Sequence, residues 1–125
     1  SFPTLHINEY VVWEILEPLI QNSIDHAVDE NIKIWLVTRF DPDKKRGLIE
    51  ILDNGPGINH SLLEKNEQGI RKIFQENITT KTDDENRGYG CFLAYEICLR
   101  CGWQLDVTNK PDGGAHFFIR ITGLS

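Results

Sequence analysis

The sequence predicts an α+β domain, a two-layer sandwich in which helices cover one face of a mixed, mainly antiparallel sheet. Segments with the apolar spacing of helices alternate with pairs of short segments rich in β-branched and aromatic residues. The chain has 125 residues, which suits one domain, and 40% of them are hydrophobic, which is enough to form a core. When helices pack on one face of a sheet, the apolar side of the helices and the apolar face of the sheet are both buried.

The first predicted element is a helix over residues 8–28. Apolar side chains recur there three and four residues apart, and acidic and amide residues separate them. Pro18 lies inside this pattern. Because proline lacks a backbone N–H and fits best in a first turn, we expect a kink or a new first turn at that position.

Two strands and a loop are predicted next. Residues 31–40 alternate and are rich in β-branched and aromatic side chains, which favours a strand, and residues 48–52 form the returning strand. The turn between them, residues 41–47, contains Asp, Pro and Gly, which are typical of turns. Residues 53–57, Asp-Asn-Gly-Pro-Gly, can continue neither a strand nor a helix, and we expect a loop.

The second half of the chain is predicted to contain two helices and two more strands. The helices cover residues 61–74 and 89–100, and a polar, aperiodic and mobile loop over residues 76–88 separates them. Gly102 is placed to end the second of these helices. Residues 103–108 and 116–122 are predicted to be strands, joined by a turn over residues 110–114.

Charge, hydropathy and cysteine content exclude several classes of protein. The net charge of −6 gives no overall attraction to nucleic acid or to an anionic membrane. No apolar run could span a bilayer, and no signal peptide is recognisable. The sequence has no initiator Met, so we expect a domain excised from a longer protein. Three cysteines at spacings that fit no disulfide framework suit a reducing cytoplasm. Cys98 and Cys101 could form a metal or redox pair, or could simply lie on one turn of a helix.

Two glycine-rich segments could approach a ligand. Asp53 ends a predicted strand, where its carboxylate can accept a hydrogen bond from an exocyclic amine, and Gly55 and Gly57 allow the backbone to come close. Gly88 and Gly90 open a predicted helix, whose free N–H groups suit a phosphate. Taken singly, each segment is better explained as an ordinary turn.

A third polar feature lies on the first predicted helix. Asn22 and His26 share one helical stripe with Ile15 and Leu19, which places an amide and an imidazole on the inward-facing side. An amide oxygen can be a ligand of Mg²⁺, which keeps water and phosphate oxygens as its other ligands. A core asparagine whose hydrogen bonds are satisfied by the protein is the alternative.

In their order along the chain, these segments resemble the motifs of the GHKL superfamily of ATPases, and most closely those of sensor histidine kinases. The matching segments are EPLIQNSIDHA at 17–27 (N box), DNGPGI at 53–58 (G1 box), FQENITTK at 74–81 (F box), GYG at 88–90 (start of the G2 box) and GGAHF at 113–117 (closing turn and strand). The resemblance covers nearly the whole of residues 1–125. It implies the Bergerat fold, ATP and Mg²⁺ as cofactors, and transfer of the γ-phosphoryl group to a histidine.

The resemblance also implies a role for each matching position. Asp53 is expected to bind the adenine amino group, and Asn22 to hold Mg²⁺ between the phosphates. Asn22 and Lys81, which is expected to meet the γ-phosphate, are the implied catalytic residues. Phe74 is expected to anchor a lid over the nucleotide. The remaining positions implied to contact the nucleotide are His26, Gly55, Gly57, Ile58, Thr79, Thr80, Gly88, Tyr89 and Gly90.

The implied partners are a dimerisation domain carrying the phosphoacceptor histidine and, downstream, the receiver domain of a response regulator. We expect the parent protein to be a homodimer, and expect neither nucleic acid nor direct membrane insertion for this domain. The sequence departs from the family pattern at Pro18, Asp25, Phe92 and His116. Two alternatives therefore stay open, another GHKL enzyme of the anti-sigma serine kinase type and a degenerate nucleotide-binding interaction module.

Overall fold

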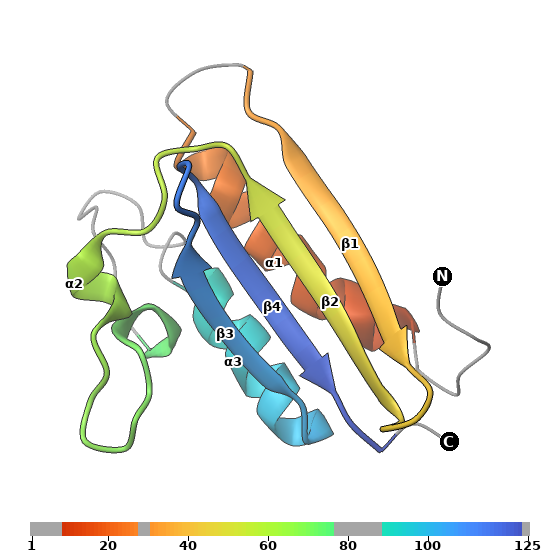
Figure 1. Ribbon diagram of the computed structural model, residues 1–125. Coiled ribbons are helices and arrows are strands. Elements are labelled where there is room, and N and C mark those ends of the chain that lie inside the picture. Colours follow the sequence, from red (N-terminus) through yellow and green to blue (C-terminus); the bar gives the residue numbers. More distant parts are fainter. Residues whose placement is uncertain (1–8, 28–30, 77–88, 124–125) are drawn as a thin grey trace.

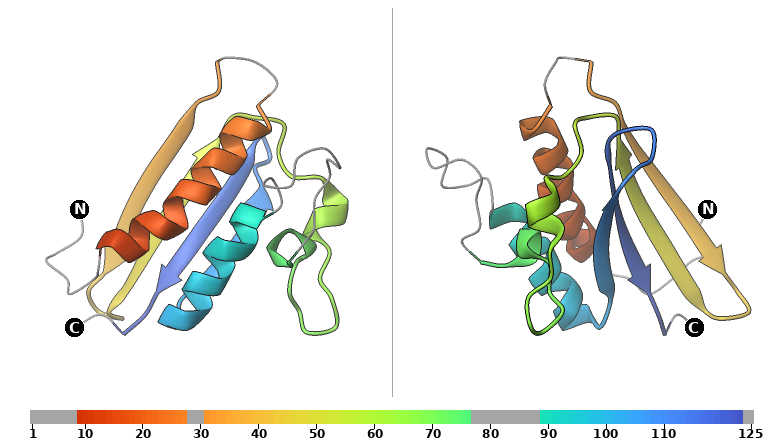
Figure 2. Two further views of the ribbon diagram at one scale, coloured as in Figure 1. Left: turned by 180° about the vertical axis from the view of Figure 1, so that it is seen from behind. Right: turned by 60° about the vertical axis from the view of Figure 1, so that its left-hand side comes forward.

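The computed structural model describes residues 9–27, 31–76 and 89–123, which form two layers (Figure 1). One layer is a four-stranded sheet in the order β1-β2-β4-β3, and every neighbouring pair is antiparallel. The strands are β1 (Ile34–Asp41), β2 (Arg46–Asp53), β3 (Gln104–Asn109) and β4 (Ala115–Ile121). The helices α1 (Glu9–Asp25) and α3 (Tyr89–Cys101) lie side by side across one face (Figure 2). The predicted two-layer α+β fold is confirmed.

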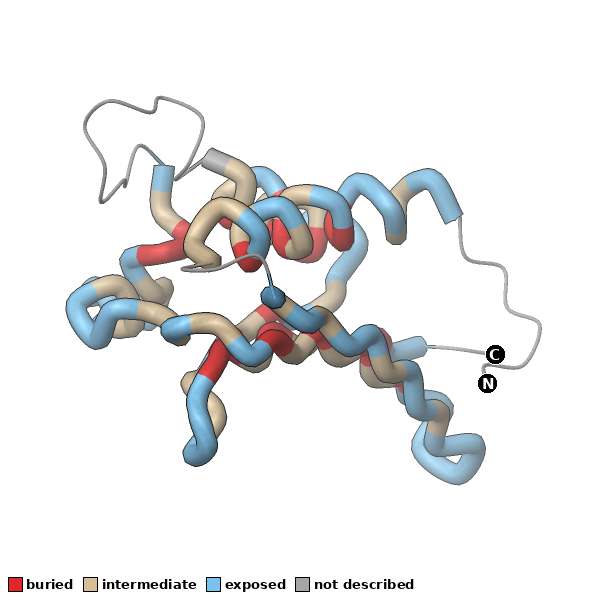
Figure 3. The backbone as a smooth tube through the Cα atoms, turned by 90° about the horizontal axis from the view of Figure 1, so that it is seen from above, coloured by how far each residue is buried: buried red, intermediate tan, exposed pale blue. Residues whose placement is uncertain are grey.

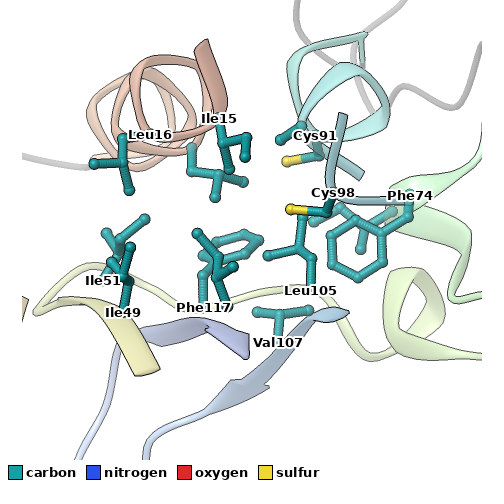
Figure 4. Close-up of a cluster of buried hydrophobic side chains, with 14 of the residues drawn as sticks. Ile15, Leu16, Ile49, Ile51, Phe74, Cys91, Cys98, Leu105, Val107 and Phe117 are labelled. Atoms are coloured by element: carbon teal, nitrogen blue, oxygen red, sulfur yellow. The ribbon is translucent and has the colours of Figure 1, made fainter. Parts of the chain in front are cut away.

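The core lies between the helices and the sheet, where the buried segments face one another (Figure 3). Every second residue of β2 is buried, so the side chains on one face of this strand lie in the core. The buried residues of α1 are spaced by three and four, as the sequence predicts. Both layers contribute to the cluster in Figure 4, which includes Ile15, Leu16, Ile49, Ile51, Phe74, Cys91, Cys98, Leu105, Val107 and Phe117. Each fully buried side chain of this size contributes about 1.5–3 kcal/mol.

Helix α1 continues without a break through Pro18, so the expected new first turn is wrong. Pro18 packs against the start of α3 at Gly90. A Cβ added to Gly90 would lie 3.0 Å from the Cβ of Pro18 and 3.5 Å from its carbonyl oxygen. This close packing of the two helices offsets the backbone hydrogen bond that the proline cannot make.

The predicted helix over residues 61–74 is also wrong. The structure has only the short helix α2 (His60–Leu63) and the 3₁₀ turn η1 (Lys72–Phe74), with a loop between them. The side-chain oxygen of Asn66 accepts the backbone N–H groups of Gln68 and Ile70 at 2.9 and 3.0 Å, and Gly69 has a φ of +80°. An asparagine side chain that takes up backbone donors competes with helix formation, and a glycine with positive φ ends it.

This loop is fastened to β3 by an ion pair. Nε of Arg71 donates to Oδ1 of Asp106 at 2.6 Å, and Nη1 of Arg71 donates to the carbonyl oxygen of Leu63 at 2.8 Å. Burial alone would raise the pKa of Asp106. Hydrogen bonds from Arg71 and from the backbone N–H of Val107, with the charges of Arg71 and Lys65, outweigh burial and hold the pKa below its usual 3.8.

Asp106→Asn is expected to lower the free energy of unfolding at pH 7 by about 1 kcal/mol or less, since the pair is partly exposed. The folded-state pKa is lowered, so this stabilisation is present above the unfolded-state pKa and is lost as the pH falls below it. Urea unfolding at pH 7, 4 and 3 should therefore show the parent and the variant converging. Asp112→Asn, an exposed carboxylate, is the control. A difference of the same size at pH 7 and at pH 3 would contradict this account.

The cysteines do not form a metal or redox centre in the described part of the chain. Cys91 and Cys98 are buried in the core, whereas Cys101 is exposed, and all three are free thiols. No group of three or more candidate metal-ligating side chains occurs among residues 9–27, 31–76 and 89–123. The structure supports the alternative, in which Cys98 and Cys101 simply lie on one helix, α3, and differ in exposure. No helix in the same ranges is long and apolar enough to cross a membrane.

Only Cys101 should react quickly with a thiol reagent in the folded domain. Burial raises the pKa of Cys91 to about 12, and burial with the nearby Cys101 raises that of Cys98 to about 12. The thiolate is the reactive form, so both buried thiols stay inert. Titration with a chromogenic disulfide at pH 8 should count one fast thiol in buffer and three in urea. A second fast thiol in buffer, absent from Cys98→Ala, would contradict the burial of Cys98.

Candidate nucleotide site

A buried carboxylate stands where α1, β2 and β4 come together. Asp53 is the last residue of β2 and is only 4% exposed. Its Oδ2 accepts the hydroxyl of Ser23 at 2.7 Å, and its Oδ1 accepts the backbone N–H groups of Gly55 and Ala115 at 2.9 and 3.0 Å. A carboxylate has about four acceptor positions, so these three bonds fix its orientation and leave Oδ2 able to accept one more donor.

In the loop after Asp53, other side chains of the domain lie close to the two glycines and leave little room beside them. A Cβ on Gly55 would lie 3.2 Å from Cδ1 of Ile32, and one on Gly57 would lie 2.8 Å from Oδ1 of Asn109. Gly57 also has a φ of +83°, which favours glycine. The sequence predicts that these glycines allow a ligand to come close, and the structure adds close packing within the domain as a second reason for glycine at both positions.

The closing turn between β3 and β4 lies against the same carboxylate. Gly114 has a φ of +97°, and a Cβ there would overlap the backbone carbonyl oxygen of Asp53. Nζ of Lys110 donates to that oxygen at 3.1 Å and lies 5.3 Å from the centre of the Trp35 ring, a cation–π distance. The turn thus closes one side of the site.

The end of α1 supplies the amide and the imidazole that the sequence analysis singled out. Nδ1 of His26 lies 2.9 Å from the backbone carbonyl oxygen of Asn22, which orients the ring. No hydrogen bond of the Asn22 carboxamide is found within residues 9–27, 31–76 and 89–123, which leaves its oxygen as a candidate ligand for a cation. Asp25, one of the departures from the family pattern, accepts a hydrogen bond from Gln21 at 2.9 Å. That bond keeps the carboxylate beside its own helix.

The structure gathers some of the predicted residues and separates others. Asn22, His26, Asp53 and the loop over residues 55–58 lie at one end of the sandwich, linked by the bond between Ser23 and Asp53. Phe74 instead lies in the core, stacked on Tyr95 at 5.0 Å and 2% exposed. Thr79, Thr80, Lys81 and Gly88, with nearly all of the predicted loop, fall outside the described residues.

Two further predicted positions begin α3, namely Tyr89 and Gly90. Gly90 is the contact point with Pro18, and its expected role beside phosphate stays a prediction. His116, one of the departures from the family pattern, alternates with the buried Ala115 and Phe117. Its side chain therefore lies on the sheet face away from the helices, with Nε2 3.9 Å from Oε1 of Glu50.

Sequence reasoning missed three contributors to the site. Ser23 stands next to Asn22 in the matching N-box segment, so its position could have drawn attention to it. Ala115 likewise lies in the matching segment 113–117. Asn109 carries no such local signal, because its contact with Ile58 crosses 51 residues of chain.

As a chemical environment, the site combines a fixed, buried acceptor with a backbone loop close beside it. An exocyclic amine that donates to Oδ2 of Asp53 would meet an acceptor that is already oriented, so little reorganisation is needed. Nearby, the free amide oxygen of Asn22 offers a neutral ligand for a hard cation. A planar base carrying an amino group, attached to a metal-bound anion, satisfies both features.

Comparison with known proteins gives consistent matches. A family model described as "Histidine kinase-, DNA gyrase B-, and HSP90-like ATPase" matches residues 8–123. The sensor protein kinase PilS of Pseudomonas aeruginosa is 27% identical over 111 residues, 87% of this chain and 19% of PilS. The sensor protein CitS of Halalkalibacterium halodurans is 30% identical over 115 residues, 86% of this chain and 20% of CitS. The chain thus spans about a fifth of the length of these relatives.

Solved structures of histidine kinases share the fold. The catalytic domain of histidine kinase ThkA, in a nucleotide-free form, superposes with a TM-score of 0.71 at 26% identity, over 92% of this chain and 68% of that one. Full-length ShkA in complex with AMPPNP gives a TM-score of 0.71 at 20% identity, over 99% of this chain and 24% of ShkA. The second likeness concerns the fold alone.

Proposed function

This chain belongs to the histidine kinase-, DNA gyrase B- and HSP90-like ATPase family and is an ATP-binding catalytic domain of the sensor histidine kinase type, and we propose that Asp53 is its adenine-binding residue. The observation that carries this proposal is the carboxylate itself, 4% exposed and oriented by three donors. Adenine offers its 6-amino group as a donor, whereas guanine has an oxygen there that would repel the carboxylate. The site therefore selects adenine.

We further propose that Asn22 holds Mg²⁺ at the phosphates. Its carboxamide oxygen is free of described hydrogen bonds, and an oxygen donor of this kind fits a hard cation that keeps several waters. Bound there, Mg²⁺ would neutralise charge on the phosphates during transfer. The contact with the backbone carbonyl oxygen of Asn22 orients the imidazole ring of His26. This ring is proposed to line the part of the site that binds the phosphates.

The proposed reaction is transfer of the ATP γ-phosphoryl group to a histidine on a separate dimerisation domain. Phosphoryl transfer needs positioning and charge neutralisation more than a protein nucleophile, which suits a site built from an amide, a carboxylate and glycines. Lys81, Thr79, Thr80, Gly88, Tyr89 and Gly90 are proposed to contact the phosphates, and Phe74 to anchor the lid. A receiver domain downstream, a homodimeric parent and a cytoplasmic location complete the proposal.

Calorimetry with a non-hydrolysable ATP analogue and Mg²⁺ tests nucleotide binding. Binding that needs Mg²⁺, and is much weaker for the GTP analogue, is the expected result. Absence of binding would favour the degenerate interaction module. Equal affinity for the two analogues would contradict the role of Asp53.

The acceptor is tested with labelled ATP. The chain alone should form no acid-labile phosphate, and adding the parent protein's dimerisation domain should place label on a histidine of that domain. Phosphohistidine on the chain's own His6, His26, His60 or His116 without added protein would overturn the proposed division into two domains. Acid-stable phosphate on serine of an added protein would favour the serine kinase alternative.

A further inference from the structure

The loop after β2 is held by a side chain from β3, the strand at the edge of the sheet. Oδ1 of Asn109, the last residue of β3, accepts the backbone N–H of Ile58 at 2.7 Å. Its Nδ2 donates to the backbone carbonyl oxygen of the same Ile58 at 2.9 Å. One carboxamide thus pairs with both polar groups of one loop residue, as a neighbouring strand would.

The path of the loop at Gly57 follows the Asn109 amide closely. A Cβ on Gly57 would lie 2.8 Å from Oδ1 and 3.2 Å from Cγ of Asn109, and Gly57 has a φ of +83°. A segment with glycines at 55 and 57 has many backbone conformations available to it. The two bonds from Asn109 select one of them.

Asn109 also couples this loop to the carboxylate of Asp53. It pairs with Ala115 in the β3–β4 ladder, and the N–H of Ala115 donates to Oδ1 of Asp53 at 3.0 Å. The neighbouring Lys110 donates to the backbone oxygen of Asp53 at 3.1 Å. One end of the β3–β4 hairpin therefore fixes both the acceptor and the loop beside it.

We propose that Asn109 is a positioning residue for adenine binding, holding the loop over residues 55–58 at a fixed distance from the Asp53 carboxylate. The inference rests on the proposed function, because it assumes that the base lies between these two parts. Asn109 acts through Ile58 and Gly57 and touches no phosphate. Its loss should consequently weaken the binding of every ligand that contains adenine, whatever the number of phosphates.

Asn109→Ala is expected to raise the Kd of ATP, ADP and adenosine by a similar factor of about ten, which corresponds to about 1.4 kcal/mol. Titrations are made at a temperature where circular dichroism shows the variant folded. Asn109→Asp keeps the shape and the acceptor for the N–H of Ile58, but it places a carboxylate oxygen against the carbonyl oxygen of Ile58, where the two acceptors repel. It should therefore lower the affinity as well, and it serves if the alanine variant folds poorly. In the free protein, the Ile58 amide should exchange with solvent faster in Asn109→Ala, which removes the acceptor of its N–H.

Asn66→Ala is the matched control, since the Asn66 side chain also accepts two backbone N–H groups of a loop, but away from the site. It should lower the melting temperature while leaving the Kd of all three ligands within twofold of the parent. A folded Asn109→Ala with the parent's affinity would overturn the proposal, as would a loss seen with ATP but not with adenosine. Failure of the parent itself to bind nucleotide would overturn the proposed function and this role with it, a result visible before any variant is made.

Discussion

Gly114→Ala is expected to prevent the domain from folding stably, whereas Gly113→Ala, in the same turn, should only weaken it. The φ angles are +97° and +104°, so a side chain at either position costs about 1–2 kcal/mol of backbone strain. No described atom lies within 4 Å of a Cβ on Gly113. A Cβ on Gly114 would overlap the carbonyl oxygen of Asp53 and lie 2.8 Å from its carbonyl carbon. Backbone atoms of a central strand cannot move aside as a flexible side chain can.

Urea unfolding followed by circular dichroism measures this difference. Gly113→Ala should lose about 1–2 kcal/mol, and Gly114→Ala at least about 3 kcal/mol, a large part of the stability of a small domain. Calorimetry with an ATP analogue should find Gly113→Ala competent to bind. Equal losses for the two variants would mean that the closing turn is not pressed against Asp53.

Asp53→Ala should weaken ATP binding by roughly ten- to a hundredfold. A hydrogen bond to a charged group is worth about 1.5–3 kcal/mol, and each 1.4 kcal/mol is tenfold in Kd. The same change leaves the hydroxyl of Ser23 and the N–H groups of Gly55 and Ala115 without their acceptor, so the domain should also lose stability.

Asp53→Asn separates the two effects. The carboxamide keeps the shape, and its oxygen can still accept both backbone N–H groups, so most of the stability should remain. Its NH₂ would face the adenine amino group, donor against donor, so calorimetry should show that affinity for ATP falls and the preference over GTP shrinks. Glu50→Gln, on the same strand but on the opposite sheet face, is the control and should bind as the parent does. Unchanged adenine preference in Asp53→Asn would contradict direct recognition of the base.

Much of the fold follows from the sequence because the information is local. Apolar spacing located α1 and α3, and alternation located the four strands to within a few residues. The helix expected over residues 61–74 failed because Asn66 and Gly69 provide an alternative set of backbone hydrogen bonds, which apolar spacing does not register. At Pro18 the error was the opposite one, because a new first turn was expected where the helix continues. The contact of Pro18 with Gly90 of α3 stabilises the continuous helix α1.

The sequence by itself determined the family, the element order and the residues with binding chemistry, since motif order and residue type are properties of the chain. Tertiary structure decided how these residues are oriented. The three donors to Asp53 come from three separate segments of the chain, and the pairing of Asn109 with Ile58 joins residues 51 apart. The hydrogen bonds between distant segments form only once α1 has packed on the sheet and β4 has paired with β2 and β3, because only then do their partners come within reach, and no local pattern can encode them.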